Sequence, residues 1–180
     1  YFHFSPSHGA SGGLLTSWDD NTVICTKTHS DIYSLTCWFE FRATDLSFLV
    51  TNVYGPCDHS LKPVFLNSLS TLKTMITGPS TIIGDFNLTL HPSERSNANF
   101  NHAEAMLFSS TIHLLQLQDL PLLERIYTCC NQQYNPILVK LDRALINVLW
   151  SQSVPDSSLI SCSRTTSDQV PICLSASTSI

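Results

Sequence analysis

Apolar residues alternate with polar ones in the first third of the chain. The alternation is clearest over residues 32–41, and residues 48–54 form a more continuous apolar run. A period of two is typical of a half-buried strand. Shorter apolar runs at 14–15 and 23–25 come before these segments. Because no helical pattern separates them, the four runs predict an antiparallel meander.

Two later segments repeat their apolar residues at helical spacing. The first begins at Ser60, which can cap it, has Pro63 in its first turn and extends to about Ile76. The second covers residues 102–115, with Asn101 as its cap. Serine and asparagine are favoured caps, and proline fits the first turn of a helix. We expect the first helix to pack on the outside of a sheet.

The last third returns to short strands. Residues 126–128 and 138–146 are predicted strands, with a turn at 131–136, and residues 164–174 form a polar turn followed by a final strand. Asp142 lies in the middle of an otherwise apolar strand. A buried carboxylate is costly unless it is paired or hydrogen bonded, so Asp142 is a candidate functional residue.

The segment with the most chemical content follows a predicted buried strand at residues 82–83. Gly84 allows the backbone to turn, and Asp85 and Asn87 come next with Phe86 between them. In an extended segment, Asp85 and Asn87 share one face and Phe86 takes the other. A carboxylate beside an amide suits the handling of a water, a phosphate or a metal ion. The same pair is also common in a plain turn, so other residues must decide.

Composition limits the possible functions. The 180 residues fit one domain, residues 1–180, with 43% hydrophobic and only 13% charged residues. The formal net charge of −5 argues against general binding of nucleic acid, because that requires many cations. No apolar run is long enough to span a membrane and no signal peptide opens the chain, which predicts a soluble intracellular protein.

The seven cysteines are scattered and include no Cys-x-x-Cys pair. This pattern argues against a zinc site and against a disulfide framework. We expect most of them to be reduced and to fill buried positions as small apolar residues. The seven histidines are equally dispersed and show no ligand spacing.

Four motifs occur in one order along the chain. They are Asn-Val-Tyr-Gly-Pro at 52–56, Gly-Asp-Phe-Asn at 84–87, Leu-Asp-Arg-Ala-Leu at 141–145 and Ser-Asp-Gln-Val-Pro at 167–171. Together they resemble the endonuclease/exonuclease/phosphatase superfamily, whose fold is that of DNase I. Further motifs resemble, more narrowly, the endonuclease domain of plant LINE-type (non-LTR) retrotransposons; these stand at 11–13, 95–97, 119–122 and 164–168.

The resemblance implies an α+β protein with a four-layered α/β sandwich, in which two facing mixed β-sheets are flanked by helices. In the family, the first two strands carry an asparagine and then a metal-binding glutamate. This chain is expected to begin after both strands, as a copy that is incomplete at its N-terminus.

The implied reaction is Mg²⁺-dependent hydrolysis of a phosphodiester bond in DNA. By resemblance, Asp85 orients or deprotonates the attacking water, and Asn87 holds that water and a phosphate oxygen. Tyr54 donates to the phosphate or stabilises the leaving group. Asp142 and Asp168 orient the family's histidine or lie near the metal.

Three further positions take their roles from the same resemblance. Thr128 corresponds to a residue that contacts phosphate, and Ser167 supports the turn that follows it. Gln169 stands where the family has its histidine, and glutamine cannot give or take a proton. Asp168 remains as one carboxylate for the metal, so we expect weak Mg²⁺ binding if there is any, and weak or absent catalysis.

Four interpretations stay open at this point. The first is a retrotransposon endonuclease domain with little catalysis, whose partners are DNA and the element's reverse transcriptase and whose location is nuclear. The second is an active phosphodiesterase or phosphatase of the superfamily. The third is a non-catalytic remnant that binds nucleic acid or a protein. The fourth is an ordinary α+β domain with accidental motifs.

Overall fold

The computed structural model describes residues 1–7, 13–131, 133–163 and 167–176. Its centre is a six-stranded mixed sheet in the order β3-β4-β5-β6-β10-β7. The bounds of these strands are β3 (Val23–Ser30), β4 (Ser34–Phe41), β5 (Ser47–Tyr54), β6 (Ser80–Asp85), β10 (Asp142–Asn147) and β7 (Leu117–Asp119).

The antiparallel meander is confirmed for β3, β4 and β5, which pair in sequence order. The chain then passes through helix α1 (Lys62–Thr71) and returns as β6, parallel to β5. On its other side β6 pairs with β10 in the antiparallel sense. β6 therefore lies inside the sheet, as its apolar sequence predicts.

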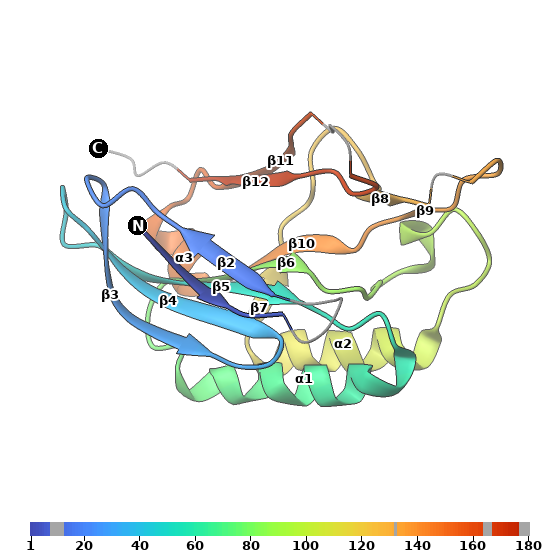
Figure 1. Cartoon of the computed structure of the whole chain (residues 1–180), viewed down its shortest axis with the longest axis horizontal. Helices are drawn as coiled ribbons and strands as arrows, with labels where there is room; N and C mark the ends of the chain where they lie inside the picture. Colours follow the sequence, from blue (N-terminus) through green and yellow to red (C-terminus); the bar gives the residue numbers. More distant parts are fainter. Residues whose placement is uncertain (8–12, 132, 164–166, 177–180) are drawn as a thin grey trace.

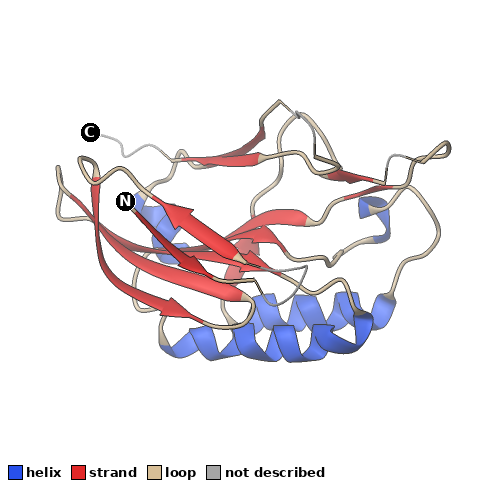
Figure 2. Ribbon diagram, in the orientation of Figure 1, coloured by secondary structure: helices blue, strands red, loops and turns tan. Residues whose placement is uncertain are grey.

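Helices cover one face of this sheet. Figure 1 shows α1 and α2 (His102–Leu114) side by side beneath the strands, and Figure 2 shows the same two helices in blue beneath the red strands. Phe65 from α1 and Phe108 from α2 are fully buried there, and Phe86 lies between them in the core. The apolar residues that repeat at helical spacing in the sequence thus form the core between the helices and the sheet.

Short strand pairs cover the opposite face (Figure 1). They are β1 (Phe2–Ser5) with β2 (Leu14–Ser17), β11 (Ser158–Ser161) with β12 (Ile172–Ser175), and β8 (Cys129–Cys130) with β9 (Leu138–Val139). Helix α3 (Val148–Ser153) follows β10 directly, and its Trp150 packs edge-on against Phe48 at 5.9 Å between ring centroids. The predicted α+β sandwich of facing sheets with helices outside is confirmed.

The first predicted helix begins differently from the expectation. It is a 3-10 turn (η1, His59–Leu61), then α1, then a second 3-10 turn (η2, Leu72–Thr74). Asp58 is the capping residue, because its side chain accepts from the Ser60 N–H, so the prediction of Ser60 as the cap is wrong. The second helix is confirmed, and the Asn101 side chain accepts from the N–H of Glu104 at 3.2 Å.

The later strands are shorter than predicted. Residues 126–128 are not a strand, and pairing begins only at β8. The predicted strand 138–146 divides into β9 and β10, with Lys140 and Leu141 between them. The interruption coincides with Thr128, whose Oγ1 accepts from the N–H groups of Leu141 at 3.0 Å and Asp142 at 3.1 Å. Asp142 is consequently the first residue of β10 and not its middle.

Two other expectations change. Only Cys37 is buried, and three of the free cysteines are exposed, so most are not core fillers: the exposed ones are Cys57, Cys162 and Cys173. The strand predicted over 32–41 starts at Ser34, and Ile32 is exposed. The turn at 11–13, the start of the 164–174 segment and the last four residues fall wholly or partly outside the described residues. Within the part that is described, no helix is long and apolar enough to cross a membrane.

Candidate active site

Three predicted site residues lie in one row across adjacent strands. Tyr54 ends β5 and pairs in register with Asp85 at the end of β6. Asp85 in turn stands opposite Asp142, the first residue of β10. Because the pairing is fixed on both sides of β6, the sheet itself brings a phenol and two carboxylates together. They come from three of the four motifs found in the sequence.

Gly84 makes this row possible. Its φ is +142°, and a Cβ atom at this position would lie 2.2 Å from the carbonyl oxygen of Val53. Only glycine allows the two strands to approach so closely here. Beyond the row, the N–H of Gly55 donates to the carbonyl oxygen of Asp85 at 2.7 Å, which continues the contact past the strand ends.

Asp85 and Asn87 contact each other, as predicted, but through a turn. Asn87 has a left-handed backbone with φ of +51°, so it does not continue the alternation of the strand. Its N–H donates to Oδ1 of Asp85 at 2.8 Å, and its Nδ2 donates to Oδ2 at 3.1 Å. Nδ2 also donates to the carbonyl oxygen of Gly55 at 2.9 Å. The amide therefore holds the carboxylate in one orientation.

Gln169 completes the environment of Asp85. Its Nε2 donates to Oδ2 of Asp85 at 2.8 Å, across 84 positions of sequence. Asp85 is only 6% exposed. Burial raises its pKa, and the hydrogen bonds from Asn87 and Gln169 partly oppose this rise. The resemblance predicts that Asp142 and Asp168 orient the residue at this position, but the Gln169 side chain donates to Asp85 instead.

Asp142 is the second buried carboxylate of the row. It is buried, and its Oδ2 has no hydrogen-bond partner among the described residues. Burial raises its pKa to about 6, with smaller contributions from the charges of Asp85 and Asp168. Thr128 is 1% exposed and accepts from two backbone N–H groups at this strand start. Contact of Thr128 with a phosphate remains a prediction, and the observed partners give it a positioning role.

The C-terminal loop brings Asp168 and Ser167 to the edge of the same site. Both are exposed, and the Asp168 carbonyl oxygen accepts from the N–H of Cys130 at 3.0 Å. The Ser167 hydroxyl accepts from the N–H of Gln169 at 3.1 Å, which is the predicted support of this turn. The charge of Asp168 is close enough to raise the pKa of Tyr54, after burial and Cys57 and Asp85. Tyr54 is therefore a neutral phenol near pH 7 and can donate.

The residues present do not assemble a centre for Mg²⁺. Magnesium requires several oxygen ligands in near-octahedral geometry. Both oxygens of Asp85 accept from Asn87 or Gln169, and Asp168 lies at the exposed rim. Among residues 1–7, 13–131, 133–163 and 167–176, no group of three or more His, Cys, Asp or Glu could hold a metal ion. No chemical step is therefore assigned to a metal here.

Lys62 is a site residue that the sequence did not single out. It is 6% exposed, and its Nζ donates to the carbonyl oxygen of Asn87 at 2.7 Å and lies 3.3 Å from Glu104. Lys62 precedes Leu66 and Leu69 by four and seven positions, so a lysine stands in the buried stripe of α1. A lysine at a position where the helical pattern expects an apolar residue could have indicated from the sequence that Lys62 has a buried partner.

A second buried network lies beneath the row. Arg143 is fully buried and makes two hydrogen bonds to the Glu94 carboxylate and one of 2.6 Å to Asp119. Lys140 also pairs with Asp119 at 2.8 Å. Burial alone would raise the pKa of Glu94, but Arg143 holds it below its usual value. Arg143, the residue after Asp142 in the motif, thus joins β10 to Glu94 and to Asp119 at the end of β7.

No protein-family model matches the sequence, and a sequence search of curated proteins finds no significant match. Solved structures do match. The facing sheets and outer helices correspond to the DNase I-like fold, which includes an endonuclease/exonuclease/phosphatase family protein from Bacteroides thetaiotaomicron (TM-score 0.57, 14% identity, 90% of this chain and 67% of that one).

More particularly, the chain is similar to the endonuclease domain of TRAS1, a telomere-specific non-LTR retrotransposon. The TM-score is 0.75 at 12% identity, over 98% of this chain and 79% of that one. It is also similar to the AP endonuclease LMAP from Leishmania major, with a TM-score of 0.62 at 17% identity, over 80% of this chain and 54% of that one. At these identities the likeness defines the fold.

Proposed function

We propose that the chain is an endonuclease domain of the non-LTR retrotransposon class that hydrolyses phosphodiester bonds in DNA at a low rate. The observation that carries the proposal is the Asp85 carboxylate, held by Asn87 and Gln169 beside the Tyr54 phenol. The similarity to a retrotransposon endonuclease domain supports it.

The chemistry follows from the free lone pairs of this arrangement. An ionised carboxylate can accept about four hydrogen bonds, and Asp85 accepts three from Asn87 and Gln169. Oδ1 accepts only one of them and can take a proton from an attacking water. The neutral Tyr54 phenol donates to the phosphate. Gln169 orients Asp85 but transfers no proton, and loss of such a transfer costs about 10²–10⁴ in rate.

Hydrolysis of bis(p-nitrophenyl) phosphate and nicking of supercoiled plasmid test the proposal, each with Mg²⁺ and with EDTA. We expect slow turnover by the natural chain, an increase of about 10²–10⁴ in Gln169→His, and loss of that increase when Asp85→Asn is added. Suppression by EDTA would show that a bound metal takes part, although the described residues offer no group of three or more ligands for one. Absence of hydrolysis in both the natural chain and Gln169→His, with circular dichroism unchanged, would contradict the proposal.

The wider setting belongs to the same proposal. A domain of this class would act beside a reverse transcriptase of the same element, in the nucleus. The genomic sequence on both sides of this coding segment is the measurement: an in-frame reverse transcriptase would support this setting, and unrelated domains would argue against it.

A further inference from the structure

A cavity of about 460 Å³ lies beside Tyr54, on the side away from the two carboxylates of the row. Its size is within the range of small-ligand pockets, about 300–1,000 Å³. Its walls are mainly apolar and aromatic: Ile32, Tyr33, Tyr54, Pro56 and Leu61 line it together with Asp58. Tyr54 therefore belongs both to the row of site residues and to the wall of this cavity.

The aromatic walls are held in place before any ligand arrives. The Tyr54 N–H donates to the Tyr33 carbonyl oxygen at 3.1 Å, which joins the end of β5 to the residue before β4. The Tyr33 ring packs edge-on against the buried Phe65 at 5.4 Å between centroids. The backbone bond fixes where the two tyrosines stand, and the packed Tyr33 ring offers a surface on which a flat ring can stack.

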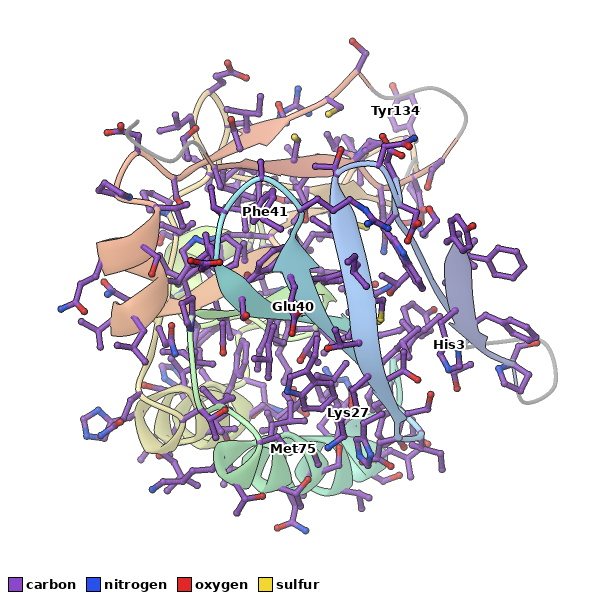
Figure 3. All side chains as sticks on the ribbon, turned by 90° about the vertical axis from the view of Figure 1, so that its left-hand side faces the viewer. His3, Lys27, Glu40, Phe41, Met75 and Tyr134 are labelled. Carbon is purple, nitrogen blue, oxygen red and sulfur yellow. The ribbon has the colours of Figure 1, made fainter. Side chains whose placement is uncertain are left out.

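Charge in the described part of the chain does not favour a duplex held by its phosphates. Lys62, Lys140 and Arg143 are buried in ion pairs, and Arg42 pairs with Asp20. Lys27 lies over the Trp38 ring at the β3 edge of the sheet (Figure 3). No lysine or arginine of the described residues lines the cavity. Affinity at this cavity therefore comes from contacts other than phosphate neutralisation by its lining residues.

The geometry points to a nucleobase subsite: an unpaired base of single-stranded DNA stacks in this cavity while the adjoining phosphate reaches Tyr54 and Asp85. This inference rests on the proposed function and specifies its substrate as single-stranded or locally unpaired DNA. Stacking on aromatic side chains is the usual source of affinity for single strands where cations are few.

Asp58 gives the subsite a preference among bases. Among the described residues that line the cavity it is the only charged one. Both hydrogen bonds from Ser60 go to its Oδ1, and no described residue donates to its Oδ2. The backbone hydrogen bond from Ser60 lowers the pKa of Asp58, so the carboxylate is ionised at neutral pH. A carboxylate accepts from the amino group of cytosine, and thymine has no amino group at that position.

Fluorescence anisotropy with short labelled oligonucleotides tests the subsite without requiring catalysis. We expect the chain to bind oligodeoxycytidine about tenfold more tightly than an abasic strand of equal length or a duplex. Leu61→Asp should remove most of this difference, whereas Leu114→Asp, at a similarly exposed leucine on α2, should leave it unchanged. Asp58→Asn keeps a capping side chain and should reduce the preference for oligodeoxycytidine over oligothymidine.

Alkylation provides a second readout, because Cys57 lines the cavity and is exposed. Bound oligodeoxycytidine should protect Cys57 from iodoacetamide, while Cys162 and Cys173, which are exposed elsewhere, should react as before. Equal affinity for abasic and base-bearing strands, or no protection of Cys57, would overturn the subsite. Failure of hydrolysis alone, measured on bis(p-nitrophenyl) phosphate, which has no base, would overturn the proposed function and leave base binding intact.

Discussion

Gln169 and Asp85, 84 positions apart, are joined by a hydrogen bond of 2.8 Å from Nε2 to Oδ2. The bond crosses from the C-terminal loop to the end of the central strand β6. It places an amide where the resemblance predicts an imidazole, and this amide donates to Asp85 rather than to the predicted partners Asp142 and Asp168. The C-terminal loop therefore reaches the carboxylate at the end of β6 through a group that donates a hydrogen bond and transfers no proton.

Gln169→Leu should raise the pKa of Asp85 further. The amide is a donor to the ionised carboxylate, so its loss removes one of the interactions that oppose the effect of burial. At pH 7 the fold should lose about 1–3 kcal/mol, the usual worth of a hydrogen bond to a charged group. The loss should become smaller below the unfolded pKa of about 4, where Asp85 is protonated in both states and accepts only as a neutral group. Carbon-13 NMR titration of the carboxyl and urea unfolding measure the two effects.

The matched control is Gln152→Leu, an exposed glutamine on α3. It should change neither the pKa of Asp85 nor the unfolding free energy at pH 7. An unchanged Asp85 titration in Gln169→Leu would show that the hydrogen bond is not maintained in solution.

Asp142→Asn should stabilise the protein at neutral pH. The folded-state pKa of Asp142 is raised to about 6 from its ordinary value of 3.8. The Asp142 carboxyl favours folding most below pH 3.8, where it is protonated in both states. This stability is lost as the pH rises through 6, and above pH 6 the buried carboxylate is charged and opposes folding. The difference corresponds to about 2–3 kcal/mol. Urea unfolding between pH 4 and pH 8 should show a gain that grows with pH.

Asp156→Asn tests whether any loss of a negative charge has the same effect. Asp156 is exposed, between α3 and β11. Its amide variant should follow the natural chain within about 0.5 kcal/mol at every pH. A gain for Asp142→Asn that does not depend on pH would mean that packing, and not ionisation, is responsible.

Local patterns in the sequence were enough to predict the elements that are stabilised locally. α2 and its Asn101 cap follow from helical spacing and capping chemistry, and β5 follows from a continuous apolar run. The strand at 126–128 failed, because Thr128 bonds to the backbone at the start of β10, a contact between distant segments. No local pattern contains that information.

The candidate site also combines features that local sequence predicts with features that depend on contacts between distant segments. The proximity of Asp85 to Asn87 was predictable, although the left-handed turn that produces it was not. The pairing of Tyr54, Asp85 and Asp142 depends on strand order and register, which only the resemblance suggested in advance. The resemblance alone could not indicate that both carboxylate oxygens of Asp85 accept hydrogen bonds from Asn87 or Gln169.

Gly84→Ala should destabilise the fold by about 3 kcal/mol or more, because it combines backbone strain of about 1–3 kcal/mol with a steric clash. The new Cβ would lie 2.2 Å from the Val53 carbonyl oxygen, at a φ of +142°. Gly78→Ala is the control, because nothing lies within 4 Å of the Cβ position there. Thermal unfolding should separate the two variants clearly. Equal midpoints would show that β5 and β6 are not so closely packed in solution.

Lys62→Met should cost about 1–3 kcal/mol, because it leaves the Asn87 carbonyl oxygen without a donor and removes the lysine from the half-buried Glu104 carboxylate, which keeps His59 as a partner. Lys73→Met, at an exposed lysine in η2, should be neutral and controls for the loss of a charge. A double-mutant cycle of Lys62→Met with Glu104→Gln should give a coupling of about 1–3 kcal/mol. Zero coupling would mean that Lys62 acts through Asn87 alone. In that case the backbone signals at Asn87, and not those of α2, should shift in the Lys62→Met spectrum.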